Sequence, residues 1–290
     1  MIRGIDFYNH VIPFLKSCPN TDFLHQSIQS MQENNDAIEV LTNNNSYQSE
    51  YLFKSYYDKI DFSKSNFVWQ HFKGWVIQTE EPTFDPDLAT FMDFRVDQGG
   101  DTRFFYVLPQ DEHTALVEIA IFSSDIPESG FYDDYLRSYI SDHIGCKSYK
   151  ILEEEINAIP MTDYDFSKEK KSDRIINIGT NGGSVKGSSG YAYKYIQKET
   201  DRLVEYISQN NLSKYKPIKN RFKFYDGIFL NAILTRKTDG EKVFSSLFRK
   251  LSPQLIFKFL DEESSFIEDL QVFTAPPTLP FTRAFIDQVF

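Results

Sequence analysis

The stretch "RIINIGTNGGSVKGSSGYAYKYIQ", residues 174–197, decides the fold that we expect of this chain. An apolar run, "IINIG", leads into a turn rich in glycine and serine, and a helical pattern follows. Gly182 and Gly183 allow close backbone approach or a positive φ. Ser188 and Ser189 are predicted to cap the next helix, whose free N–H groups favour anionic or polar ligand atoms. The order predicts a loop that holds phosphate, and a long, flexible strand-to-helix connection with a serine cap is the alternative.

The composition of the 290-residue chain excludes several classes of protein. A net charge of −11, with both signs scattered, argues against nucleic-acid binding, which needs a basic surface. The two cysteines and five histidines show no metal or redox spacing, so we expect no metal site and a cytoplasmic location. No apolar run approaches the ~20 residues that a membrane-spanning helix needs. Aromatic residues reach 16%, which suits a large core or a pocket for an apolar ligand.

The pattern along the chain predicts two lobes built from a discontinuous chain. A helix is expected over "RGIDFYNHVIPFLKS", a hairpin joins "AIEVL" to "YLFKSYY", and strands fill residues 66–122. An amphipathic helix, "FYDDYLRSYISDHI", and a strand, "SYKILEEEINAIPMTDY", precede the loop, and helices follow it. We therefore expect an α/β (α+β) fold with a cofactor lobe, a mainly antiparallel substrate sheet and a helical C-terminal part. Their predicted bounds are, in that order, 1–42 with 160–210, then 43–159, then 211–290.

A second informative stretch is "TALVEIAIF", residues 114–122, in which Glu118 is the single charge. Alternation along a strand makes both faces apolar, so the strand is predicted to be buried on both sides. Burial raises the pKa of a carboxyl group, and a carboxyl poised near neutral pH can give and take protons. The structural alternatives for Glu118 are an ion pair with Arg95 or Arg103, or a place at a sheet edge.

The stretch "FMDFRVDQ" places Phe91, Asp93, Arg95 and Asp97 on one face of a predicted strand. Three charges on one face indicate either solvent or a paired polar network. We favour a structural network of Asp93 and Arg95 beneath the substrate lobe.

The C-terminal part carries Phe244, Leu247, Phe248 and Leu251 at helical spacing. Core packing is the simplest interpretation of this apolar face. The alternative is a surface that touches the lipid bilayer.

The loop "IGTNGGSVKGSSGY" resembles the second flavin-contacting motif of FAD enzymes with the hydroxybenzoate-hydroxylase type of fold. More closely, it resembles the lycopene cyclase family, whose version runs Ile-Gly-Thr, two Gly, then Ser or Thr-Gly-Tyr. Further segments agree in the family's order: "GWVIQTEEPTFDP", "MDFRVDQ", "FFYVLP", "ALVEIAIFS", "EEEINAIPMT" and "RFKFYDGIFLNAIL". The resemblance covers essentially the whole chain and is closest to bacterial cyclases that make β-carotene from lycopene. The family usually has Pro at Gly187 and Gly at Asn157, and both changes are expected to loosen or reshape turns.

The resemblance also implies site residues. Glu118 aligns with the first glutamate of a Leu-Glu-Glu-Thr-like motif, the family's catalytic acid/base, while Ile119 and Ala120 replace the acid and Thr that follow it. Arg3 begins a helix and is implied to approach the flavin, and a surface position is the alternative that the residue alone suggests. The residues implied to contact FAD in the loop are Gly179, Thr180, Asn181, Gly182, Gly183, Gly187, Ser188, Ser189, Gly190 and Tyr191.

The implied activity is cyclisation of the linear carotene lycopene to β-ring carotenoids, with no net redox change. The implied cofactor is FAD, reduced by electrons from NADPH. A carotenoid substrate further implies a cytoplasmic protein that associates peripherally with the membrane, because carotenoids dissolve in the bilayer.

Members of the family begin with a strand, a Gly-x-Gly-x-x-Gly turn and a helix that bind the ADP half of FAD. The sequence starts downstream of that unit, so we expect a two-lobe flavoprotein lacking the first Rossmann βαβ unit. On this basis we expect little bound FAD, poor solubility and no conversion of lycopene until such a segment is supplied. The alternatives are a truncated, non-catalytic fragment, or another flavoprotein of the same fold, a monooxygenase or halogenase.

Overall fold

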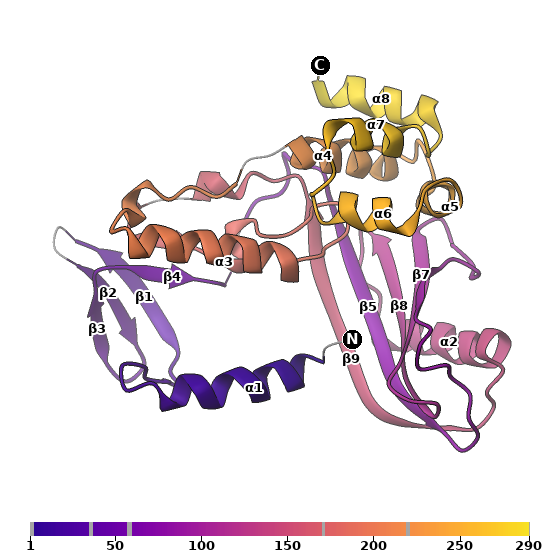
Figure 1. Cartoon of the computed structure of the whole chain (residues 1–290), viewed down its shortest axis with the longest axis horizontal. Helices are drawn as coiled ribbons and strands as arrows, with labels where there is room; N and C mark the ends of the chain where they lie inside the picture. Colours follow the sequence, from indigo (N-terminus) through magenta and orange to yellow (C-terminus); the bar gives the residue numbers. More distant parts are fainter. Residues whose placement is uncertain (1–2, 35–36, 57–59, 170–171, 219–220, 290) are drawn as a thin grey trace. The chain divides into compact units, whose positions relative to one another are not determined.

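The computed structural model describes residues 3–34, 37–56, 60–169, 172–218 and 221–289 (Figure 1). The chain divides into two compact units. Met1–Lys54 and Lys170–Ile176 form the N-terminal unit, and Ser55–Glu169 with Asn177–Phe290 form the larger unit. These units are defined by contacts between residues, whereas the predicted lobes were defined by the ligand that each was expected to bind. The assignment of a cofactor lobe and a substrate lobe therefore stays a prediction.

The N-terminal unit contains the predicted first helix and a small antiparallel sheet. The predicted helix is confirmed as α1 (Gly4–Ser17), and none of its described residues is buried. The sheet has the order β1-β2-β3, and the fourth strand of the unit pairs with β10. The bounds are β1 (Ile28–Glu33), β2 (Ile38–Thr42), β3 (Ser46–Ser49), β4 (Leu52–Lys54) and β10 (Ile175–Asn177).

The predicted hairpin partner of "AIEVL" is wrong. β2 pairs with β3, "SYQS", rather than with "YLFKSYY". The turn closes early because the N–H and Oγ1 of Thr42 both donate to the carbonyl of Asn45, at 2.9 and 2.8 Å.

The larger unit is built on a five-stranded antiparallel sheet with the order β6-β7-β8-β5-β9. It confirms the predicted strands between residues 66 and 122 and the strand that returns to the loop. The bounds are β5 (Phe67–Thr79), β6 (Thr90–Asp93), β7 (Thr102–Pro109), β8 (Thr114–Ser123) and β9 (Tyr149–Thr162).

β6 is shorter than predicted. It ends at Asp93, and Met92 has a φ of +54° beside a shift in the pairing register with β7. The common strand face predicted for residues 91–97 is therefore wrong, because the backbone leaves the strand within that stretch.

The predicted amphipathic helix covers one face of the sheet. It forms α2 (Ser129–Tyr139), which continues as a π-helical turn, Ile140–Ile144. Tyr132 and Leu136 of the helix pack against Ile119 and Ile121 of β8 in one buried cluster.

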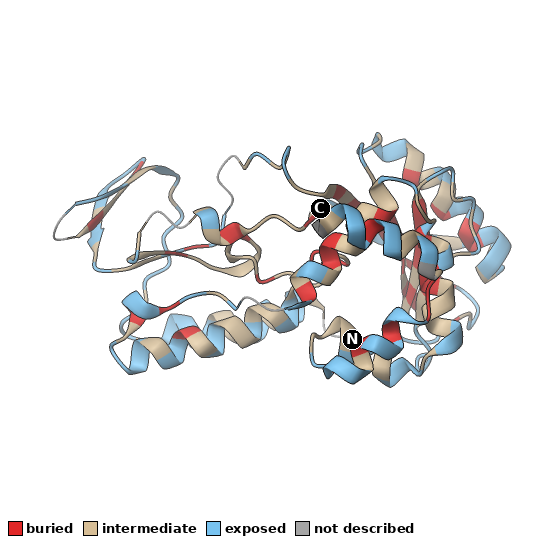
Figure 2. Ribbon diagram, turned by 90° about the horizontal axis from the view of Figure 1, so that it is seen from above, coloured by how far each residue is buried: buried red, intermediate tan, exposed pale blue. Residues whose placement is uncertain are grey.

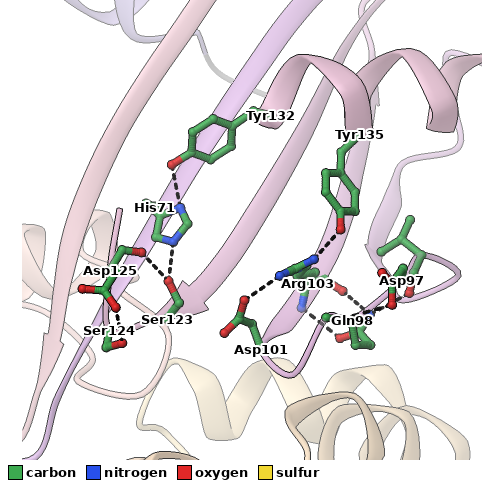
Figure 3. A network of polar contacts seen from close by, with 12 residues as sticks. His71, Asp97, Gln98, Asp101, Arg103, Ser123, Ser124, Asp125, Tyr132 and Tyr135 are labelled. Atoms are coloured by element: carbon green, nitrogen blue, oxygen red, sulfur yellow. Dashed lines mark hydrogen bonds and ion pairs between the residues drawn. The ribbon is translucent and has the colours of Figure 1, made fainter. Parts of the chain in front are cut away.

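A polar network on the same face fixes α2 to the strands (Figure 3). His71 Nδ1 lies 2.7 Å from the hydroxyl of Tyr132, and its Nε2 lies 2.7 Å from Ser123 Oγ. Arg103 pairs with Asp101 at 2.7 Å. Burial lowers the pKa of His71 to about 4, so the ring is neutral and both nitrogens have partners. These contacts give His71 a structural role.

Helices cover the opposite face of the sheet, where Phe104, Ala120 and Phe122 form a second cluster with Leu230 and Phe244. Figure 2 shows the buried residues concentrated in the strands and in the helices that cover them. Among the described residues, no helix combines the length and hydrophobicity needed to cross a membrane. The remaining helices are α3 (Tyr193–Ser208), α4 (Arg221–Leu234), α5 (Gly240–Lys250), α6 (Pro253–Leu260), α7 (Phe266–Phe273) and α8 (Thr278–Val289).

Candidate functional site

Glu118 lies in the middle of the sheet. Its strand, β8, runs between β7 and β5, so Glu118 is opposite Tyr106 on one side and Gly74 on the other. The sheet-edge alternative is therefore wrong. The ion-pair alternative is also wrong, since Arg95 pairs with Asp93 at 2.5 Å and Arg103 pairs with Asp101.

A second carboxyl group meets Glu118 across a glycine. Gly74 of β5 is opposite Glu118 on β8 and opposite Glu155 on β9. A Cβ atom at Gly74 would lie 3.0 Å from Glu155 Oε1 and 2.9 Å from Leu116 Cδ1. The missing side chain thus leaves the space in which the two carboxyl groups approach each other over the middle strand.

The pKa of Glu118 is raised to about 8, first by burial and then by the hydrogen bond and charge repulsion from Glu155. An unpaired carboxylate in a low dielectric is costly, so the neutral form is favoured. Glu118 therefore holds a proton at neutral pH and can donate it, as a general acid does.

Two tyrosines join the predicted loop to this part of the sheet. The hydroxyl of Tyr191, from the loop, lies 3.1 Å from that of Tyr106, which is opposite Glu118. Burial raises the pKa of Tyr191 to about 12, and burial also raises the pKa of Tyr106 well above its ordinary value. Both hydroxyls stay protonated, and the structure brings the end of the loop together with the predicted catalytic strand.

The glycines of the loop are required by the fold of the loop itself. Gly179, Gly183 and Gly190 have φ values of +63°, +81° and +71°, which L side chains rarely adopt. A Cβ atom on Gly182 would lie 2.6 Å from the carbonyl oxygen of Asn177. Gly179 differs from the other glycines of the loop, because no described atom lies within 4 Å of the position that its Cβ atom would take.

The predicted serine caps are wrong. Helix α3 begins at Tyr193 after Ala192, and no side chain caps its N-terminus. Ser189 Oγ instead accepts a bond from the N–H of Tyr191, at 3.4 Å. Eight backbone N–H groups between Gly182 and Tyr191 donate to atoms of the protein, so they do not form a phosphate cradle.

Asp226 of α4 fixes the centre of the loop. Its carboxylate accepts bonds from the N–H of Gly187 at 3.1 Å and from Ser188 Oγ at 2.6 Å. Lys186, fully buried, forms an ion pair with it at 2.8 Å. Gly187 therefore does not loosen the loop, since its N–H makes a bond that a proline could not make.

Asn157 also lies elsewhere than predicted. It is in the interior of β9, opposite Phe72, so the turn expected at this position is wrong. Thr180 and Asn181 form a short 3-10 turn, Gly179–Gly182, in which Asn181 is buried.

A buried oxygen atom without a hydrogen-bond partner indicates whether the residues around the loop suit a flavin. The amide oxygen of Gln70 is buried and has no hydrogen-bond partner among the described residues. It lies 2.7 Å from the position of a Cβ on Gly190. A free acceptor, open space at Gly179 and adjacent tyrosines fit an uncharged ring system with N–H groups, such as the flavin ring.

Asp93 and Arg95 form the expected pair. Burial raises the pKa of Asp93, but bonds from Arg95 and from the hydroxyl of Tyr139, at 2.7 Å, outweigh it and hold that pKa at about 2. Arg95 is 70% exposed, and the bond from Tyr139 to Asp93 connects the end of β6 to α2. Arg3 belongs to the N-terminal unit, at the N-cap of α1, and its contact with a flavin stays a prediction.

An aromatic cavity of about 400 Å³ lies among helices α4 to α8. Phe244, Leu247 and Phe248 line it, which places the predicted apolar face of α5 in the protein interior. Ser188 and Ser189 of the loop form part of its wall. Phe91 contacts Tyr106 at 5.4 Å between ring centroids and Phe248 at 5.8 Å, so aromatic rings connect the neighbour of Glu118 with the cavity.

The family model described as lycopene cyclase protein matches residues 15–286. The chain belongs to the lycopene cyclase family. This match confirms the resemblance inferred from the loop and from the segments around Glu118. Among curated proteins, none matches the sequence.

Solved structures show the fold of this lycopene cyclase family member. A geranylgeranyl bacteriochlorophyll reductase-like protein from Thermoplasma acidophilum has a TM-score of 0.56 and 13% identity, over 98% of this chain and 74% of that chain. HpxO of Klebsiella pneumoniae, complexed with FAD, has a TM-score of 0.49 and 11% identity, over 95% and 74%. The halogenase PltM, in complex with phloroglucinol and FAD, has a TM-score of 0.48 and 11% identity, over 98% and 62%. The predicted α/β fold of the hydroxybenzoate-hydroxylase type is confirmed.

Sequence reasoning missed several residues of the site in this family member. The sequence alone assigns no role to Glu155, Gly74, Gln70 or Asp226. A strand register is needed to place Glu155 beside Glu118, since the two are 37 positions apart in the sequence. The three consecutive acids on a strand were the available signal, because a solvated face needs only every second residue to be polar.

Proposed function

We propose that this chain is a lycopene β-cyclase-like protein in which Glu118 is the catalytic acid/base. The observation that carries the proposal is the Glu118 carboxyl group in an otherwise apolar strand of a lycopene cyclase family member, where burial and a second acid raise its pKa. Cyclisation of a hydrocarbon needs a proton donor in an apolar site, and few other groups in such a site hold a proton that can be released near neutral pH.

In the proposed reaction the proton of Glu118 forms a C–H bond at the terminal C1=C2 double bond of lycopene. The electrons of the inner double bond then close the six-membered ring on the resulting cation. Loss of a ring proton to the Glu118 carboxylate forms the double bond of the β-ring. One proton is added and one is removed, so the carotenoid is isomerised with no net redox change.

Aromatic rings suit the cationic intermediate. Phe91, Tyr106 and Tyr191 lie close to or in contact with one another on the face of the sheet that α4 and α5 cover. The faces of such rings attract a positive charge, and their apolar edges keep water from quenching it. The aromatic cavity beyond Phe248 would accept apolar carbon chain.

FAD is proposed as the cofactor, in line with the FAD that HpxO and PltM contain. Gly179, Gly190 and Tyr191 would lie against its ring, and Gln70 Oε1 would accept a bond from a ring N–H. When bound and reduced by electrons from NADPH, FAD would supply negative charge beside the substrate cation. Peripheral association with a membrane, from the cytoplasm, would give the protein access to lycopene.

The test is expression of the chain in lycopene-accumulating bacteria, alone and together with a Gly-x-Gly-x-x-Gly segment from a relative. We expect β-ring carotenoids in extracts by chromatography with the segment supplied, and in the absence of oxygen. Glu118→Gln, which keeps the size of the side chain, should lower product formation at least about 100-fold while FAD binding persists.

Two results would contradict the proposal. If FAD-loaded protein leaves lycopene acyclic, the proposed activity is wrong. If the Glu118→Gln variant cyclises lycopene at a near-normal rate, the catalytic role of Glu118 is wrong. A product that forms only with oxygen would favour a monooxygenase or halogenase instead.

A further inference from the structure

The family motif has a second acid directly after the catalytic glutamate, and this chain has Ile119 at that position. Ile119 is buried in the core beneath α2, on the opposite face from Glu118. A residue next in sequence on a strand points away from its neighbour, so an acid there could not reach Glu118 in this sheet. Any second carboxyl group that contacts Glu118 has to come from another strand.

Glu155 of β9 meets this requirement. Glu118 and Glu155 occupy the same face of the sheet because each is directly opposite Gly74. Strands two apart in a sheet are separated by about 10 Å, and two glutamate side chains can cover this distance only over an unoccupied middle position. The glycine supplies that position, since a Cβ atom there would touch Glu155 Oε1 at 3.0 Å.

Among the described residues, the other groups around Glu118 carry no compensating positive charge. Tyr106 on β7 and Tyr191 in the loop face it and are neutral, and Gly74 on β5 has no side chain. Lys73, the nearest cation along β5, points to the α2 face, where it pairs with Asp133 at 2.5 Å and with Glu154 at 3.3 Å. Glu155 is thus the ionisable acid that meets Glu118.

We propose that Glu155 is a positioning residue that shares one proton with Glu118 across Gly74 and keeps Glu118 in its protonated, donating form. Two carboxyl groups in contact cannot both ionise cheaply, so one proton is retained between them. Glu155 is exposed, which leaves the pair in contact with water at one end while Glu118 is half-buried at the other. The catalytic meaning of the pair rests on the proposed function, whereas the shared proton does not.

The test is a pH titration of the purified chain labelled with 13C at the glutamate carboxyl carbons, followed by NMR, which needs neither lycopene nor FAD. The resonance of Glu118 is the one lost in the Glu118→Gln variant. In the unsubstituted chain it should titrate well above the ordinary range of a glutamate. In Glu155→Gln its midpoint should fall by about one pH unit or more, because the repelling charge is gone and an amide donor replaces it.

Glu154→Gln is the matched control. It removes the same chemical group from the adjacent position of β9, but on the face that pairs with Lys73, so the midpoint of Glu118 should stay in place. Gly74→Ala is a second, independent variant, in which the added methyl group fills the space between the two acids and should lower the midpoint in the same direction.

An unchanged Glu118 midpoint in both Glu155→Gln and Gly74→Ala would overturn the shared proton. An equal shift in Glu154→Gln would also overturn it, because that result would indicate a general loss of negative charge. In active protein the alkaline limb of the pH–rate profile should move to lower pH in Glu155→Gln alone. If the titration is as expected but FAD-loaded protein with an unsubstituted Glu118 and Glu155 does not cyclise lycopene, the proposed function is rejected and the carboxyl pair is retained.

Discussion

At the scale of single residues, the behaviour of Glu118 is set by neighbours from three other segments. Tyr106 is opposite it on β7, Glu155 reaches it over Gly74, and Tyr191 comes from the loop. Burial and the second acid both disfavour the carboxylate, so the same contacts that make Glu118 a proton donor also make its ionisation destabilise the folded chain.

This linkage predicts how stability depends on pH. The pKa of Glu118 rises from 4.5 to about 8 on folding, so the folded chain binds the proton more tightly than the unfolded chain does. Its stabilising contribution is fully present below pH 4.5 and is lost as the pH rises through about 8. The free energy of unfolding, measured by urea titration across this range, should fall with pH in the unsubstituted chain.

Glu118→Gln is the control for this pH dependence, because a glutamine does not titrate. The slope of the free energy of unfolding against pH should be smaller in the variant. Equal slopes in the two proteins would show that Glu118 ionises normally and would contradict the raised pKa.

At the scale of elements, the loop between β10 and α3 is held by α4. Asp226 accepts bonds from two consecutive loop residues and pairs with the buried Lys186. The ammonium group of Lys186 also lies over the rings of Phe222 and Phe259, at 5.5 and 5.4 Å. The loop conformation is therefore a tertiary property, even though glycine and serine dominate its sequence.

We predict that Asp226→Ala destabilises the larger unit by about 3 kcal/mol or more, because it leaves the Lys186 charge buried without its closest partner. Chemical unfolding monitored by circular dichroism measures this loss. Asp239→Ala, which removes the exposed partner of Lys242, should cost less than about 1 kcal/mol. Similar losses in the two variants would show that the buried pair does not hold the loop.

Gly190 is predicted to matter for folding before any ligand binds. Gly190→Ala introduces a side chain at a φ of +71° and against Gln70 Oε1, so it should destabilise the chain by about 1–2 kcal/mol without FAD. Gly130→Ala, at a site in α2 with no atom within 4 Å of the Cβ position, is the control and should be neutral or stabilising. A Gly190→Ala variant that is stable alone but loses FAD would indicate that the glycine serves only the cofactor.

At the scale of the whole molecule, the C-terminal helices combine an aromatic cavity with apolar side chains on the outside. Phe266 and Ile267 of α7 are 62% and 71% exposed, and Leu279 of α8 is 62% exposed. Exposed apolar side chains on amphipathic helices suit the surface of a bilayer. These helices are the proposed site of peripheral membrane association.

We predict that the purified chain sediments with vesicles of zwitterionic lipid and that added salt does not release it. The net charge of −11 disfavours electrostatic attraction, so the binding should depend on burial of apolar surface. Ile267→Glu should weaken the binding at least about tenfold, as expected for moving a charge toward hydrocarbon. Val204→Glu, a matched change at an exposed site on α3, should leave it unchanged, and an equal loss in both would contradict the assignment.

The sequence by itself determined the long antiparallel sheet, the first helix, the helix α2, the helical C-terminal part and the family. These follow from local periodicity and from motifs that are contiguous along the chain. Glu118 could be singled out in the same way, because one charge within an apolar strand is visible in ten residues.

Only the tertiary structure decided what surrounds Glu118 and what the glycines do. Glu155 and Gly74 meet Glu118 through strand register, and Asp226 reaches the loop from a helix 38 residues away. The predicted serine caps, the strand face at Arg95 and the hairpin partner were wrong for one reason. The residue type shows that a serine can cap a helix, or that a segment can form a strand. The backbone groups that it contacts depend on where other segments of the chain pack.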